Sequence, residues 1–183
     1  MVRFRNAVTT VGAAVMLLAN GVAQTPQTPS PRMVPTSLNP PADQMLAFEL
    51  QATGVQIYEW RATKEDAARF EWSLKAPQAD LFDAAGRRVG THYSGPTWEA
   101  LDGSKVVGEV KAKDTSQSAG SIPWLLLTAK ANSGEGLFGH VKSIQRLATS
   151  GGGAPAEGPG KAQPGQEVRV PYRATYAFYR TRP

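Results

Sequence analysis

A two-residue periodicity near the C-terminus constrains the fold of this chain most strongly. The apolar and aromatic residues Val168, Val170, Tyr172, Ala174, Tyr176 and Phe178 stand at every second position. Successive side chains of a β-strand point to opposite faces of the sheet, whereas a helix brings a residue back to the same face after three or four positions. The pattern therefore predicts one long strand with a buried face.

The same periodicity recurs through most of the chain from Met45 onward. Alternating apolar positions predict strands over 46–52, 56–60 and 70–74, with a break at Thr53-Gly54 between the first two. Turns at 83–86 and 102–103 close hairpins, the second leading into a strand over 105–113. The apolar run 124–127 is a strand that is buried on both faces or starts at a sheet edge.

These elements predict an all-β, single-domain β-sandwich or partly closed β-barrel of about ten short antiparallel strands. Only residues 64–69 and the segment after Gly139 could form short helices. Residues 151–166 are rich in glycine and proline and predict a long loop before the last strand. Because this loop has no large apolar anchor of its own, we expect it to be among the most mobile segments.

The first 23 residues have the pattern of a cleavable signal peptide. Arg3 and Arg5 precede a 13-residue apolar run, and Gly21-Val22-Ala23 provides a small-x-small cleavage site. The run is too short for a stable membrane anchor, which needs about 20 apolar residues. Residues 24–44 follow as a proline-rich tether that adds nothing to a core, and residues 45–183 form the β domain.

Composition narrows the classes of function. Without the signal peptide the chain keeps 18 basic and 15 acidic residues, a net charge of +3, and it has no cysteine. An extracytoplasmic protein of this kind, periplasmic or secreted, has no disulfide, no thiol chemistry and no cysteine-bound zinc. The mild charge does not predict nucleic-acid binding, and the arginines and tyrosines of 169–182 are those of an amphipathic strand with its tyrosines inward.

No motif predicts a cofactor, a metal or a catalytic nucleophile. Gly134 to Gly139 match G-x-G-x-x-G, but no helix start follows directly, and the acid about 20 positions on, Glu157, lies inside the glycine- and proline-rich loop. A glycine-rich turn is therefore the better interpretation. The only histidines, His92 and His140, are 48 positions apart with no flanking acidic ligands, which does not favour a metal site.

The block from His92 to Glu99 contains the candidate site residues. His92, Tyr93, Trp98 and Glu99 surround the irregular Gly95-Pro96 connection, and they could present aromatic faces and hydrogen-bonding groups to a sugar ring or an aromatic ligand. The alternative is a structural corner in which Trp98 fills the core and Glu99 holds a turn. We favour the structural corner, because large aromatic residues are more often core than site.

Seven sequence blocks share a further resemblance, in their order along the chain: residues 54–58, 92–99, 102–104, 122–126, 144–146, 149–152 and 172–176. They resemble domain-of-unknown-function family 3455, whose members are exported proteins of bacteria and fungi. The resemblance implies no particular activity. It implies that many members have one cysteine at the position of Trp60 and another near Pro159, as a disulfide pair. This chain would therefore lack a covalent cross-link for loop 151–166.

Three functions remain open from the sequence. The first is a non-catalytic binding module for a small molecule, a glycan or an envelope partner. The second is a hydrolase that uses Glu99 with Asp102 or His92 as acid and base, for which the two carboxylates should face one cleft about 5–10 Å apart. The third is a structural or stress-related envelope protein.

We predict that the exported protein begins at Gln24. Cleavage after Ala23 would satisfy the preference of signal peptidase for small residues at the cleavage site. The intact mass of the protein recovered outside the cytoplasm tests this directly. Retention of residues 1–23 in that protein would contradict the prediction.

Overall fold

Eight antiparallel strands follow one three-residue helical turn in residues 33–161 and 163–183, which this computed structural model describes. The predicted signal peptide and the first part of the predicted tether lie outside these residues. The elements are η1 (Thr36–Leu38), β1 (Gln44–Ala62), β2 (Phe70–Phe82), β3 (Arg88–Tyr93), β4 (Thr97–Ala100), β5 (Lys105–Asp114), β6 (Trp124–Ser133), β7 (Ser143–Gly151) and β8 (Glu167–Thr181). No helix in the described ranges is long and apolar enough to cross a membrane.

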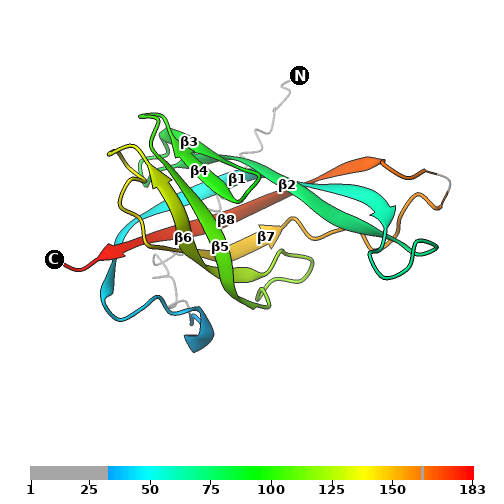
Figure 1. The fold of residues 1–183 in the computed structure, drawn as a ribbon, viewed down its shortest axis with the longest axis horizontal. Helices are drawn as coiled ribbons and strands as arrows, with labels where there is room; N and C mark the ends of the chain where they lie inside the picture. Colours follow the sequence, from blue (N-terminus) through cyan, green and yellow to red (C-terminus); the bar gives the residue numbers. More distant parts are fainter. Residues whose placement is uncertain (1–32, 162) are drawn as a thin grey trace, which may run out of the picture. The chain divides into compact units, whose positions relative to one another are not determined.

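Each strand pairs with the next along the chain, and β8 returns to pair with β1, which closes the sheet into a barrel. β1 and β8 run side by side over most of their length, and with β2 they extend past the other strands at one end (Figure 1). The all-β prediction is confirmed, and the single antiparallel sheet closes on itself as a ring rather than stacking as a sandwich.

The predicted number of strands is too high, because β1 is one continuous strand of 19 residues. Thr53 and Gly54 were expected to break it, yet they pair in register with Asp80 and Ala79 of β2. A Cβ on Gly54 would lie 2.1 Å from the Gln78 carbonyl oxygen. This glycine therefore permits a close approach of two strands rather than a turn.

The two predicted short helices are also wrong. Residues 64–69 are part of the connection from β1 to β2, where the Asp66 amide donates to Thr63 Oγ1 and the Thr63 amide donates to the Arg69 carbonyl. The segment after Gly139 leads directly into β7. Side-chain bonds to nearby backbone favour such turns over helix.

The predicted turns are confirmed. Gly86 and Gly103 have φ angles of 75° and 83°, in the left-handed region that glycine adopts at little cost. The Gly86 amide donates to the Asp83 carbonyl at 2.9 Å, as in a type I turn. The glycine-rich segment 134–139 is likewise a turn, between β6 and β7.

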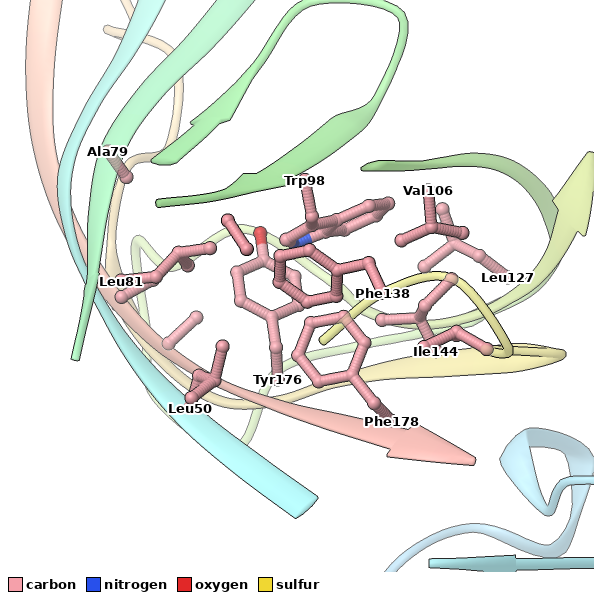
Figure 2. Packing of buried hydrophobic residues seen from close by; sticks show 14 of the residues in the cluster. Leu50, Ala79, Leu81, Trp98, Val106, Leu127, Phe138, Ile144, Tyr176 and Phe178 are labelled. Atoms are coloured by element: carbon pink, nitrogen blue, oxygen red, sulfur yellow. The ribbon is translucent and has the colours of Figure 1, made fainter. Parts of the chain in front are cut away.

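The barrel interior is packed around aromatic rings. Trp98, Phe138, Tyr176 and Phe178 are fully or almost fully buried and lie close together (Figure 2). The Trp98 ring meets Tyr176 edge-on at 5.3 Å, and Phe138 lies 5.0 Å from Phe178. Phe138 comes from the β6–β7 turn, so that turn fills the interior at its end of the barrel.

A second cluster covers the outer face of the barrel. Leu38 of η1 is completely buried against Trp124 and Leu147, and its carbonyl accepts a hydrogen bond from Gln145 Nε2. The prediction that residues before Met45 add nothing to the core is therefore wrong for this part of the segment. Trp124 and Leu126 pack under η1 while Leu125 and Leu127 face the interior, which confirms a strand covered on both faces.

Loop 151–166 is held by two tryptophans of the strands that extend past the barrel. Trp60 Nε1 donates to the Gly160 carbonyl at 2.9 Å, and Trp72 Nε1 donates to the Glu157 carbonyl at 2.8 Å. A Cβ on Gly158 would overlap the Trp60 ring at 2.2 Å. The indole of Trp60 thus contacts the loop at the place where the resemblance implies a disulfide.

We predict that Trp60→Phe loosens this loop. The variant keeps an aromatic ring and removes the N–H that binds Gly160, a bond worth about 0.5–1.5 kcal/mol. Trypsin cleavage after Lys161 should become roughly 2–10 times faster, because native-state proteolysis follows the population of the open form. Cleavage after Lys130 within β6 serves as the internal reference, and equal rates after Lys161 in both proteins would contradict the anchoring role.

Candidate functional site

The barrel wall is incomplete on one side because the β3–β4 hairpin is short. β3 pairs only with residues 79–82 of β2, and β4 pairs only with residues 105–107 of β5. Among the described residues, no strand therefore pairs with the remaining part of β2, 70–78, or with residues 109–114 of β5 on this side. The hairpin connection Ser94–Pro96 lies at the edge of the resulting opening.

A cavity of about 260 Å³ opens at this place. Its outer part is mostly apolar, with Leu74 and Val110 each about half exposed, together with Pro77 and Leu125, although Lys75 and Ser94 also line it. Its inner part is polar and aromatic, and is lined by residues from five strands: Gln56, His92, Trp98, Arg146 and Tyr176. The cavity therefore changes from apolar at the opening to polar inside.

His92 and Trp98 enter this lining from opposite positions on β3 and β4, where they form a cross-strand pair. Both are buried, and their rings stack at 4.4 Å with an interplanar angle of 14°. His92 Nδ1 lies 2.8 Å from the Thr97 carbonyl oxygen, which can only accept, so Nδ1 carries the hydrogen. Burial lowers the pKa of His92 to about 3, and His92 is a neutral imidazole with its lone pair on Nε2.

Tyr93 and Glu99 lie on the opposite face of the same two strands. The Tyr93 hydroxyl donates to Glu99 Oε2 at 2.7 Å, and Lys105 Nζ lies 3.2 Å from Glu99 Oε1. The hydrogen bonds from Tyr93 and Lys105 hold the pKa of Glu99 below its ordinary value. The strand alternation thus divides the four predicted residues, with two inside the barrel and two outside.

Asp102, the second carboxylate of the hydrolase hypothesis, is bound within its own turn. Its Oδ1 accepts bonds from the Ser104 amide and hydroxyl, and its Oδ2 accepts one from the Leu137 amide. These hydrogen bonds, first that of the Ser104 side chain, lower the pKa of Asp102. Asp102 links the β4–β5 turn to the glycine-rich turn, and within the described ranges no carboxylate lines the cavity.

Sequence reasoning missed Gln56, Arg146 and Tyr176 as site residues. The period-two pattern placed Tyr176 on the buried face of the last strand. Gln56 alternates in step with Tyr58 and Trp60, and a glutamine in this aromatic row is the signal that could have marked the site. Arg146 stands two positions after the buried Ile144 on β7 and so faces inward as well. Its role depends on which strands meet across the barrel, which no local pattern shows.

Several polar atoms around this cavity have no hydrogen-bond partner within the described ranges. They are Gln56 Nε2, Trp98 Nε1 and the hydroxyl oxygens of Tyr172 and Tyr176. All four residues are at most 2% exposed. Buried polar groups are normally paired, and an unpaired one costs about 1–3 kcal/mol. This concentration of unpaired atoms in one place is the structural feature that calls for an explanation.

Arg146 adds a positive charge to the same region. Its Nε and Nη2 both donate to the Pro123 carbonyl, at 3.0 and 2.9 Å. Its charge opposes the burial effect that raises the pKa values of Tyr172 and Tyr176, and it adds to the burial effect that lowers the pKa of His92. In residues 33–161 and 163–183, no carboxylate forms an ion pair with Arg146.

No group of three or more potential metal-binding side chains occurs in the part of the chain that the structure describes. The glycine-rich turn does not open a helix either. A Cβ on Gly136 would overlap the Asp102 carboxylate at 2.2 Å, so this glycine makes room for the Asp102 bond to Leu137. Among the described residues, what remains at this place is a cavity whose inner lining is polar and aromatic.

Comparison with known families agrees with the blocks quoted from the sequence. The profile of the family described as "Protein of unknown function (DUF3455)" matches residues 41–180. The chain belongs to this family. The match covers all eight strands, apart from the last residue of β8, and includes every residue of the cavity lining. No curated protein matches the chain.

We predict that the His92 imidazole stays neutral down to about pH 5 in the folded protein, because its folded pKa is far below the ordinary value of 6.5. As pH falls below 6.5, the unfolded chain takes up a proton that folded His92 does not. The free energy of unfolding should therefore fall with decreasing pH, by at most about 1.4 kcal/mol per pH unit from this group.

Imidazole ¹⁵N shifts measured in a His140→Gln variant test this prediction, since His92 is then the only histidine. Constant shifts from pH 8 to about pH 5 are expected for a buried neutral ring. A titration midpoint near pH 6 would show that His92 is not held as the structure describes.

Proposed function

We propose that this protein is an exported, non-catalytic binding domain that takes up a small molecule through the opening between β2 and β5. The observation that carries the proposal is the pair of buried polar atoms that have no partner in the described ranges, Gln56 Nε2 and Trp98 Nε1, on residues that line the cavity. A ligand with complementary groups would give these atoms the partners that the protein does not supply.

The size and lining of the cavity also support this function. A volume of about 260 Å³ lies just below the usual range of ligand sites, about 300–1,000 Å³, and so suits only a small molecule. The stacked rings of His92 and Trp98 offer a flat wall to a ring or a short branched chain. A long polymer has no room inside, so the proposal is a small molecule rather than a glycan chain.

The hydrolase alternative receives no support from this geometry. Both oxygens of Glu99 are engaged by Tyr93 and Lys105, and Asp102 is engaged by Ser104 and Leu137. His92 lies on the face of the sheet opposite to Glu99, so the two cannot act as an acid and base pair on one substrate. A purely structural role remains as the outcome if no ligand binds.

We predict that closing the opening abolishes binding. Leu74→Trp/Val110→Trp places two indoles at the mouth of the cavity, where the native side chains are 52% and 50% exposed and larger ones need not enter the core. Compounds that raise the Tm of the native protein in a small-molecule screen should have no effect on this variant, because ligand stabilisation requires binding to the folded state.

Leu101→Trp is the matched control, since Leu101 is 67% exposed and does not line the cavity. The control should respond to the same compounds as the native protein. Equal stabilisation of all three proteins would place binding elsewhere. If no compound stabilises the native protein and no small molecule co-purifies in its mass spectrum, the structural role replaces the binding role.

A further inference from the structure

The donors, charge and apolar residues of the cavity lining favour one chemical class of ligand. We propose that the ligand is a small organic anion, with a carboxylate or similar oxyanion held by Arg146 in the inner part and an apolar body near the opening. This inference rests on the proposed binding function and adds the chemical class of the ligand. It follows from a count of donors and acceptors, from the charge balance, and from the position of the apolar residues.

The inner lining offers more donors than acceptors. Trp98 Nε1 and the Arg146 guanidinium can only donate, and the hydroxyl of Tyr176 can donate as well. The amide of Gln56 can turn either way, so it adds a donor or an acceptor as needed. His92 Nε2 is the one fixed acceptor, because Nδ1–H is committed to the Thr97 carbonyl. A ligand group that accepts several bonds suits this set best.

The positive charge of Arg146 also favours an anionic ligand. The Arg146 charge influences the pKa values of Tyr58, His92, Tyr172 and Tyr176, so it lies close to the polar interior. Two of its nitrogens are fixed by the Pro123 carbonyl, which is neutral and leaves the positive charge uncompensated. A partly buried cation that has no counter-ion among the described residues favours an anionic ligand, and a guanidinium binds carboxylates in a defined geometry.

The residues around the opening of the cavity favour an apolar body for the rest of the ligand. Leu74, Pro77, Val110 and Leu125 surround the outer part, and the only charged side chain among the outer lining residues, Lys75, is paired with Glu167. An apolar body therefore contacts these residues while the anionic group reaches Arg146. Aromatic or branched-chain carboxylates have this division of polarity at a size that fits the cavity.

Benzoate and benzamide test the inference, since they share shape and differ in charge. We expect the native protein to bind benzoate at least about tenfold more tightly, a difference of about 1.4 kcal/mol. Arg146→Gln should remove this preference by weakening benzoate about tenfold while changing benzamide less than about twofold. Isothermal titration at low ionic strength gives both affinities.

Arg146→Lys is the matched control, because it keeps the charge and should retain much of the preference even if the bidentate geometry is lost. The native preference alone tests the inference if Arg146→Gln does not fold. Equal affinity for both probes in the native protein, or an unchanged preference in Arg146→Gln, would overturn the anionic ligand. If benzamide binds the native protein and Leu74→Trp/Val110→Trp abolishes this binding, the proposed binding function is still supported. If neither probe binds and no compound in the screen does, the binding function and the anionic ligand are both contradicted.

Discussion

The pairing of β8 with β1 is the contact on which the rest of the structure depends. It extends from Gln44 opposite Thr181 to Glu59 opposite Glu167, and it joins the two ends of the sheet. Without it, both strands would be open edges and the inward faces of all eight strands would have no common interior. With it, Tyr172, Tyr176 and Phe178 of the last strand face Trp98 and Phe138 from the middle of the chain.

The arrangement of the strands in the closed sheet also explains why the part of the interior near β2 and β5 is polar and contains a cavity. Phe138 and Val141 of the β6–β7 turn fill the interior near Phe178, while the short β3–β4 hairpin leaves the wall open between β2 and β5. Polar side chains that alternation turns inward, Gln56 and Arg146 among them, therefore meet a cavity instead of packed side chains. The incomplete wall and the unpaired polar atoms are two consequences of one topology, and the proposed binding function is built on both.

The loop before β8 illustrates how one contact can replace another. The family resemblance implies a disulfide between the position of Trp60 and a residue near Pro159, and this chain has no cysteine. Trp60 instead packs on Gly158 and donates to the Gly160 carbonyl, and Trp72 holds Glu157. A hydrogen-bonded indole restrains the loop less than a disulfide would. The hydrogen bond can break and re-form when the loop opens locally, whereas a disulfide stays closed.

The sequence by itself determined the all-β class of this protein, two of its turns and the buried face of its last strand. Period-two alternation identified β8 and the inward side of β1, and Gly86 and Gly103 identified their turns, because these signals depend on neighbouring residues only. Only the tertiary structure decided that His92 and Trp98 face a cavity with Gln56, Arg146 and Tyr176, while Tyr93 and Glu99 face away from it. Which strands become neighbours depends on pairings between residues far apart in the chain, and no local pattern encodes that register.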